Sequence, residues 1–512
     1  MKIFNTAGPV NMPFHYKIDP LHRWDLNDIL LHIKLERYFI LHAPRQTGKT
    51  SSLLALQEYL NNSGEYFAIY ATFELGQACV HNVKDGVKAI ISQIKSRAED
   101  KVSEIKNLNI FDIVETAGAE NALKSFLSKI CDISKKPVVL LADEVNTLIG
   151  DTLISVLRQL KDIYEDNDTN LPVSMILCCV KDLKDEMIKT SKHEIINSGS
   201  ILNIDTESLT MRNFSKDEIN HLLQQHTECI EQRFNDKCLD VVFNYTDGQP
   251  WLVNALLEEA TSDIKENRNP SVTITPEILE TAKQNLVISK EIHLDQIVNK
   301  LDRDWMKRII LPMILGEKAE QQESDIKKCI ELNLVKYINN CYQIANPIYK
   351  DIIIDELTNL GFDNFLHKFR INSLNHDGSL NVKQILNILK EFWNEESDIP
   401  ICYVRGYQDA TPQLFVQAFL RRVANGNGFV NREYGLGKGR TDIMLKWQYD
   451  KEGQTIYQKI VMELKVINQK QSYDKLKQQA IEQTAKYAKT CGTKEAHILI
   501  FDRHKSQNWQ AD

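Results

Sequence analysis

Apolar residues along this chain gather in short runs, and segments with helical spacing of apolar positions lie between them. The runs span residues 37–42, 66–71, 137–142, 173–180 and 200–204. Short, nearly continuous apolar runs are typical of parallel strands that are buried on both faces. The pattern predicts an α/β domain in which helices cover both faces of a five-stranded parallel sheet.

The loop after the first run has the composition of a phosphate-binding loop. Residues 43–50 read APRQTGKT, and a helical pattern follows at once. Strand, loop and helix in this order are the context of a P-loop. Gly48 lets the backbone approach the phosphates, Lys49 reaches the β- and γ-phosphates, and the Thr50 hydroxyl ligates Mg²⁺. We therefore expect ATP to bind at Ala43, Pro44, Arg45, Gln46, Thr47, Gly48, Lys49, Thr50 and Ser51.

One position departs from the P-loop pattern. Ala43 stands where GxxxxGK[ST] has its first glycine. Alanine is the smallest alternative, and the turn survives there if φ stays negative. The alternative interpretation is a chance GKT in a surface loop.

A pair of acidic residues ends the run at 137–142. Asp143 at the end of a buried strand can hold Mg²⁺ together with Thr50, and Glu144 can orient the attacking water as a catalytic residue. An acidic N-cap after a strand is the alternative. The end of the next run, near Lys181, is a weaker candidate for a γ-phosphate sensor, and Lys181 can equally be a solvated lysine.

These motifs carry a family resemblance. Together with residues 245–255, YTDGQPWLVNA, they resemble prokaryotic AAA-like ATPases related to archaeal and STAND ATPases, many of which carry a C-terminal nuclease-like domain. The resemblance implies that Gly248 to Pro250 begin a lid helix near the nucleotide. It also implies a trans-acting role for Arg158.

The middle of the chain is predicted to be helical and then to form a small mixed domain. Residues 205–300 have a helical pattern with a Ser215 cap. A helix at 325–332, strands at 334–338 and 341–344 and a helix from Pro347 give the outline of a winged helix. Such a domain can read DNA or can act as a strut, and its modest basic charge favours the strut.

Two strands near the C-terminus bring charged residues together. The alternating pattern of 457–466 places Glu463 and Lys465 on one face. If the strand at 440–445 pairs beside it, Asp442 shares that face, and the two carboxylates can hold a hard divalent ion. The ion would polarise a phosphate, while Lys465 would position the nucleophile or stabilise the developing charge.

This arrangement resembles the PD-(D/E)XK nuclease superfamily, with its D…ExK core at Asp442, Glu463 and Lys465. The following helix contains Gln483 and Tyr487, similar to the QxxxY element of the superfamily, which implies that Gln483 assists the site. Mg²⁺ is the expected ion, with Mn²⁺ as a substitute. The alternative is a nuclease fold that keeps these residues for binding or stability and does not cut.

Length and composition set the broad class. With 512 residues the chain exceeds a single core, and the patterns divide it into an ATPase core (1–205), a helical lid region (206–300), a winged-helix-like domain (301–360), a connector (361–400) and a nuclease-like domain (401–512). Ten scattered cysteines, no membrane-length apolar run and no export signal predict a cytoplasmic protein.

Charge is unevenly distributed. Residues 401–512 have a balance of +7, with 18 Lys and Arg against 11 Asp and Glu, whereas the remaining residues have a balance of −15. A positive C-terminal part suits a phosphate-backbone partner. Drift of surface charge between domains is the alternative.

Together these patterns predict an ATP-binding and ATP-hydrolysing enzyme coupled to metal-dependent cleavage of nucleic acid, with DNA favoured. Resemblance points to defence against mobile DNA or its maintenance. Two alternatives stay open: a nucleotide-switched signalling or assembly protein whose C-terminal domain binds without cutting, and a winged-helix DNA-binding regulator. A homo-oligomer is compatible with all three.

Overall fold

The computed structural model describes most of the chain, in two compact units. The described residues are 2–10, 13–166, 170–179, 187–191, 195–197, 208–289, 304–315, 323–338, 340–359, 374–395, 416, 419, 420, 423, 428–436, 439–451, 454–467, 473–493 and 495–502. One unit comprises Met1–Leu286, Glu323–Asn339 and Ala345–Pro347; the other comprises Val287–Gln322, Asn340–Ile344 and Ile348–Asp512. The finer division into five segments stays a prediction.

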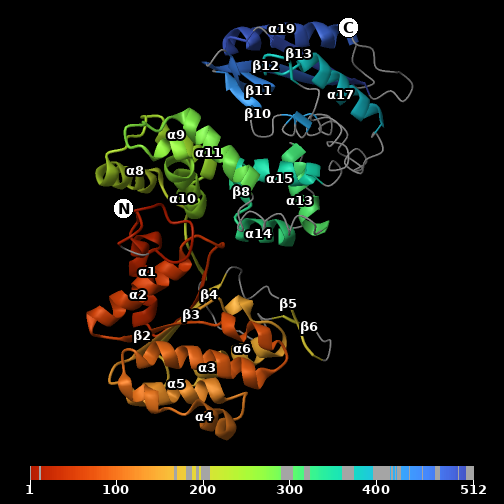
Figure 1. Ribbon diagram of the computed structural model, residues 1–512. Coiled ribbons are helices and arrows are strands. Elements are labelled where there is room, and N and C mark those ends of the chain that lie inside the picture. Colours follow the sequence, from red (N-terminus) through yellow and green to blue (C-terminus); the bar gives the residue numbers. More distant parts are fainter. Residues whose placement is uncertain are drawn as a thin grey trace. The chain divides into compact units, whose positions relative to one another are not determined.

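A parallel sheet forms the centre of the first unit (Figure 1). Its strand order is β2-β3-β4-β1-β7, so β4 lies between the strand that precedes the phosphate loop and the strand that ends in Asp143. The strands are β1 (Tyr38–His42), β2 (Phe67–Thr72), β3 (Val138–Asp143), β4 (Ser174–Cys179) and β7 (Ser208–Thr210). The five-stranded parallel sheet is therefore confirmed.

The fifth strand lies at a different place from the predicted one. The expected run at 200–204 falls outside the described residues, and β7 pairs with β1 instead. A small antiparallel pair, β5 (Met187–Lys189) and β6 (Ile195–Asn197), was not predicted.

Helices cover both faces of this sheet, because its strands are apolar on both sides. Side chains of α1 and α2 pack with Phe39, Leu41 and Leu141 on one face. The helices α3, α5 and α6 pack with Ile40, Ile69 and neighbouring residues on the other face, where α4 also contributes side chains. The bounds are α1 (Leu26–Lys34), α2 (Lys49–Ser63), α3 (Val83–Glu99), α4 (Ile110–Ala117), α5 (Ala122–Ile133) and α6 (Gly150–Glu165).

A helical region follows the sheet in the sequence. It contains α8 (Lys216–Ile230), α9 (Cys238–Thr246), α10 (Pro250–Glu258) and α11 (Pro276–Ser289). Ser215 and Glu218 form a reciprocal capping box at the start of α8, as the sequence predicted. Pro250 begins α10, where its missing N–H costs no hydrogen bond.

The predicted helix–hairpin–helix is present between residues 304 and 359. It consists of α13 (Asp304–Leu315), α14 (Glu323–Glu331), β8 (Val335–Ile338), β9 (Cys341–Ile344) and α15 (Pro347–Asn359). β8 and β9 form a two-stranded sheet. Its assignment as a winged helix stays a prediction.

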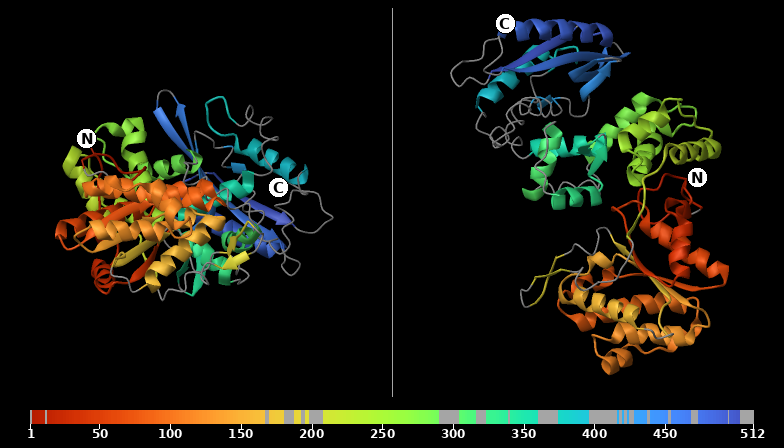
Figure 2. Two further views of the ribbon diagram at one scale, coloured as in Figure 1. Left: turned by 90° about the horizontal axis from the view of Figure 1, so that it is seen from below. Right: turned by 180° about the vertical axis from the view of Figure 1, so that it is seen from behind.

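The C-terminal sheet, whose strands are blue in Figure 2, has the strand order β10-β11-β12-β13. The strands are β10 (Gly428–Leu436), β11 (Gly439–Lys451), β12 (Gln454–Ile467) and β13 (Glu495–Asp502). The first three are antiparallel, and β13 runs parallel to β12. α19 (Tyr473–Cys491) packs Tyr487 against one face, and α17 (Val382–Glu395) contributes to the larger core on the other.

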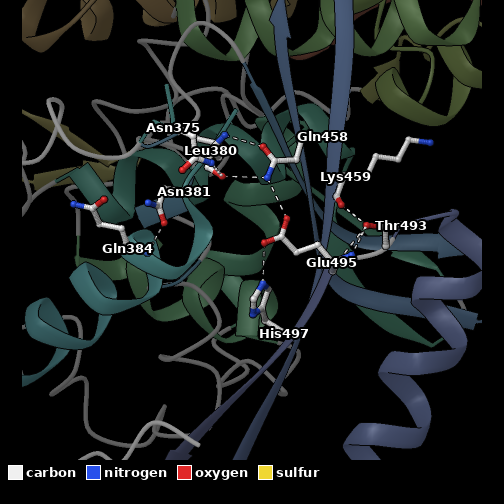
Figure 3. A network of polar contacts seen from close by, with 9 residues as sticks. All are labelled: Asn375, Leu380, Asn381, Gln384, Gln458, Lys459, Thr493, Glu495 and His497. Atoms are coloured by element: carbon white, nitrogen blue, oxygen red, sulfur yellow. Dashed lines mark hydrogen bonds and ion pairs between the residues drawn. The ribbon is translucent and has the colours of Figure 1, made fainter. Parts of the chain in front are cut away.

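A polar network fastens the turn before α17 to this larger-core face (Figure 3). Gln458 on β12 accepts from the Leu380 backbone N–H at 2.8 Å and donates to Glu495 at 3.1 Å. His497 lies 3.4 Å from the other oxygen of Glu495. Gln458 shares its strand face with Ile460 and Met462, so this network lies on the opposite side of the sheet from Glu463.

No helix in the described part of the chain combines the length and apolar character needed to cross a bilayer.

Candidate nucleotide and nuclease sites

The loop after β1 has the backbone shape of an anion cradle. Gln46 and Gly48 have positive φ angles of 58° and 95°, and Gly48 is the N-cap of α2. Alternation of backbone conformation here turns successive N–H groups inward, and the helix N-terminus adds its partial positive charge. Glycine is needed at 48 because a side chain is strained at that φ.

Ala43 occupies the position of the missing glycine without strain. It is not among the positive-φ residues, and its backbone N–H donates to the Cys179 carbonyl at 3.1 Å. The turn therefore keeps its shape with a methyl group at this position, as the sequence predicted it would if φ stayed negative.

Lys49 is buried and directed into the loop. Its Nζ donates to the carbonyls of Ala43 at 3.1 Å and Pro44 at 2.9 Å. The Thr47 hydroxyl also donates to the Pro44 carbonyl, at 2.8 Å. These bonds hold the ammonium beside the N-terminus of α2, where a β- or γ-phosphate would meet it.

The structure brings Thr50 and Asp143 together, although 93 positions separate them in the sequence. The Thr50 hydroxyl donates to Asp143 Oδ2 at 2.8 Å, and Asp143 is 1% exposed. A hydroxyl and a carboxylate in contact are the oxygen donors that Mg²⁺ prefers beside nucleotide phosphates. The donor set fits the predicted ion.

Glu144 begins the turn after β3 with a strained backbone. Its φ of 57° lies in the left-handed region, which few non-glycine residues adopt. Burial raises the pKa of the Glu144 carboxyl, and nearby Lys49 partly offsets that effect. Glu144 therefore lies within electrostatic reach of the loop lysine, at the place expected for a water-orienting carboxylate.

The other residues predicted to contact nucleotide also lie on this loop. Arg45 and Gln46 are exposed, and Ser51 is in the first turn of α2, where its hydroxyl accepts from the Val10 N–H at 3.0 Å. Arg158 is exposed on α6. The suggested sensor position near Lys181 lies outside the described residues.

Two residues of this site were missed in the sequence. The Tyr70 hydroxyl donates to Asp143 Oδ2 at 3.1 Å. Cys178 on β4 lies beside Asp143, and burial, reinforced by that carboxylate, raises the pKa of its thiol. Both look like ordinary apolar strand residues. The alternation of side chains along each strand could have identified them, because Tyr70, Leu141 and Cys178 belong to the same core layer.

The second candidate site lies on β12. Glu463 is 1% exposed, and Lys465 Nζ donates to Glu463 Oε1 at 2.8 Å. Lys465 also donates to Gln483 Oε1 at 3.3 Å, and Gln483 donates to the Tyr487 hydroxyl at 3.1 Å. The predicted ExK pair and the two residues of the α19 motif thus form one hydrogen-bonded chain.

Asp442 lies on the neighbouring strand, in register with this chain. Ile443 of β11 pairs with Met462 of β12 at the end of an antiparallel ladder, and Asp442 and Glu463 are the next residues along the two strands. Directly opposed residues lie on the same face of a sheet. That Asp442 shares the site with Glu463 and Lys465 stays a prediction.

The carboxylate groups of this site are suitable ligands for a divalent ion. Within the described side chains no group of three potential ligands occurs. Glu463 supplies one buried carboxylate, and Asp442 stays the predicted source of a second. Two carboxylates are the protein share of a magnesium site in which water and phosphate oxygens complete the shell.

Residues 413–501 match the PD-(D/E)XK nuclease superfamily, a range that contains Asp442, Glu463, Lys465 and Gln483. These residues form a PD-(D/E)XK nuclease domain. The nuclease domain begins within the segment predicted at 401–512, and β13 ends it one residue beyond the match. No curated protein matches the chain.

Several solved structures are similar to the chain at low identity. The Walker-type ATPase PABY2304 of Pyrococcus abyssi has 13% identity and a TM-score of 0.45, with 68% of this chain and 99% of that chain covered. The RuvB Holliday junction branch migration motor of Thermotoga maritima has 11% identity, coverages of 64% and 94% and a TM-score of 0.33. The Aeropyrum pernix ORC1 protein in complex with DNA has 12% identity, coverages of 71% and 95% and a TM-score of 0.34.

The assignment of the first unit rests on its own loop. The strand–loop–helix around Lys49 and the Thr50–Asp143 bond give a P-loop ATPase core, and the nuclease domain follows it in the chain. The prediction of an α/β P-loop ATPase joined to a PD-(D/E)XK domain is confirmed. The predicted class, an enzyme with ATPase and nuclease halves, is supported by the same observations.

Proposed function

We propose that the protein binds and hydrolyses ATP in its N-terminal unit and cleaves DNA in its nuclease domain with the help of a divalent ion. The observation that carries the nuclease half is the Glu463–Lys465–Gln483 chain inside the family-matched range. The Thr50–Asp143 bond beside Lys49 supports the ATPase half.

In the ATPase half, each side chain has a distinct role. Lys49 and the N-terminus of α2 bind the β- and γ-phosphates, while Thr50 and Asp143 hold Mg²⁺. The ion neutralises charge on the phosphate oxygens. Glu144 orients the water, and its raised pKa makes its carboxylate a stronger proton acceptor once ionised.

In the nuclease half, Glu463 and Asp442 would hold Mg²⁺ or Mn²⁺. Such an ion would polarise the scissile phosphate and lower the pKa of bound water. Lys465 stabilises the negative charge that develops on the phosphate, and Gln483 holds the ammonium at the correct angle. Hydrolysis by water needs no 2′-hydroxyl, so this set of residues suits a DNA backbone.

The remaining finer predictions belong to this proposal. The positive charge balance of residues 401–512 supports a nucleic-acid partner. A cytoplasmic location, predicted from the sequence, is part of this proposal. The biological setting and oligomeric state stay predictions.

The first prediction tests the nuclease half. We expect Lys465→Ala and Glu463→Gln to lower cleavage of plasmid DNA by at least about a hundredfold, the usual loss when a charge-stabilising group is removed. The matched control is Lys459→Ala, which removes an exposed lysine from the same strand. Plasmid, linear duplex, single-stranded DNA and RNA are each incubated with Mg²⁺, Mn²⁺ or a chelator, with and without ATP.

Equal cleavage by wild type and both site variants would contradict the proposal. Cleavage of RNA but not of DNA would support the nuclease activity and show that its substrate is RNA. A change of mass on adding ATP, with no cleavage of any nucleic acid, would favour the signalling or assembly alternative. DNA binding that is lost on mutation of the β8–β9 hairpin and insensitive to Asp442 would favour the regulator.

A further inference from the structure

Arg23 is a buried cation beside the phosphate loop. It ends the short 3-10 helix η1 (Pro20–Arg23), which contacts α2 in the red part of the chain in Figure 1. The Ser52 hydroxyl of α2 donates to the Pro20 carbonyl at 3.0 Å, and this bond fixes the two elements together. Arg23 itself is 4% exposed.

The charge of Arg23 is poorly compensated. One Nη donates to the Arg212 carbonyl, and the guanidinium lies 4.4 Å above the centre of the Phe214 ring. Among the described residues, no acceptor faces its Nε and no carboxylate pairs with it. Glu218, the acid whose charge acts on Arg23, forms two hydrogen bonds with Arg212 instead, at 2.6 and 2.9 Å. Burial lowers the pKa of Arg23 to about 10.

The guanidinium faces the residue that shapes the phosphate loop. A methyl group built on Gly48 would lie 3.9 Å from Arg23 Nη1. Gly48 is the N-cap of the 15-residue helix α2, whose N-terminal amides favour an anion. A buried, undercompensated cation at this place is costly for the protein alone. An anion at the loop would supply the missing counter-charge.

We propose that Arg23 is a further nucleotide-binding residue, whose guanidinium contacts a phosphate of the nucleoside triphosphate held at Gly48. The inference rests on the proposed ATP binding at this loop and adds a residue from outside the motif. The planar guanidinium has a donor fork that matches phosphate geometry. Through its bond to the Arg212 carbonyl, the same residue connects the phosphate to the segment that leads into α8.

The test measures ATP and adenosine binding by calorimetry with the full chain. Arg23→Met removes the charge and keeps an apolar stem. Because replacing a buried cation by an apolar side chain is often neutral or stabilising, we expect the nucleotide-free protein to melt at the wild-type temperature or above. We expect ATP affinity to fall about tenfold or more, as for loss of a charge-assisted hydrogen bond, with adenosine affinity unchanged. Arg23→Gln is expected to give the same fall in ATP affinity, again with adenosine affinity unchanged.

Arg212→Gln is the matched control. It removes a neighbouring guanidinium, keeps the backbone carbonyl that accepts from Arg23, and is expected to bind ATP like wild type. ATP binding by Arg23→Met at wild-type strength, or equal losses for ATP and adenosine, would overturn the inference and leave Arg23 a structural residue. Failure of the ATP site itself is distinguishable, because wild type and Lys49→Ala would then show the same ATP affinity.

Discussion

Each candidate site contains a lysine whose ammonium is held by protein oxygens. Lys49 donates to the carbonyls of Ala43 and Pro44, and Lys465 donates to Glu463 and Gln483. Because each ammonium is held in place before the substrate binds, the protein reorganises less when negative charge develops on a phosphate. Both lysines are therefore suited to stabilise negative charge on a phosphate. Substituting them tests each site most directly.

Glu144 gives a prediction at the residue scale. Glu144→Gln is expected to lower ATP turnover by about a hundredfold or more, since it removes the water-orienting carboxylate, while ATP binding persists. Because burial raises the pKa of Glu144, wild-type turnover should decline in acid at a higher pH than an exposed glutamate would give. Turnover and nucleotide affinity are measured against Glu58→Gln, an exposed carboxylate on α2.

The same pKa shift has a consequence for stability. The folded protein binds the Glu144 proton more tightly than the unfolded chain does, so this group's contribution to stability falls as pH rises between the two pKa values. Glu144→Gln should therefore raise the free energy of unfolding relative to wild type, and this gain should be larger near neutral pH than in acid. Full turnover by Glu144→Gln, or loss of ATP binding, would contradict the assigned role.

At the scale of elements, the start of the helical region depends on a close backbone contact. Gly248 has a φ of 70°, and a methyl group built there would lie 2.1 Å from the Phe214 carbonyl oxygen. Gly64, at the end of α2, has a similar φ of 78° but no atom within 4 Å of such a methyl group. The two glycines share the conformational cost of a side chain and differ in packing.

We expect Gly64→Ala to cost about 1–2 kcal/mol, the conformational penalty alone. Gly248→Ala should cost at least about 2 kcal/mol more, since backbone must move to relieve the clash. Urea unfolding of the two variants, monitored at tryptophan, gives the difference from the shift in midpoint at constant slope. Equal costs for the two substitutions would show that Phe214 does not restrict this turn.

Periodicity predicted most of the elements but not the edge of the first sheet. The buried strands β1 and β3, the turn and hairpin around Asn340 and the helix from Pro347 follow from apolar runs and turn residues. β7 spans three residues, and only pairing with β1 makes it a strand. Such short strands depend on tertiary context more than on propensity, so β7 was not predicted from the sequence.

The sites were predictable where a motif or an alternation marked the residue. Asp442 and Glu463 follow from the period of two along paired strands. Arg23 lies in a non-periodic segment without a motif, and its relation to Gly48 exists only after the chain has folded. Tyr70 and Cys178 were missed although the alternation of their strands places them in one core layer, because polar groups on buried strands resemble core residues.

At the scale of the whole molecule, the two sites belong to different units, so each can be disabled separately. Within the first unit, hydrogen bonds connect the nucleotide loop's neighbourhood to strand β8: Asn213 donates to the Asp247 carbonyl at 3.0 Å, and Lys336 donates to the Asp247 carboxylate at 2.6 Å. These contacts lie next to the Arg23 partners Arg212 and Phe214. They connect β8 to the segment that contains the Arg23 partners.

The most direct test of the account measures ATP hydrolysis and DNA cleavage in parallel for wild type, Lys49→Ala and Lys465→Ala. We predict that Lys49→Ala loses ATP hydrolysis, that Lys465→Ala loses cleavage and still hydrolyses ATP, and that Lys88→Ala, an exposed lysine on α3, retains both. Undiminished cleavage by Lys465→Ala, or undiminished hydrolysis by Lys49→Ala, would contradict the claim that this chain carries two separate phosphate chemistries.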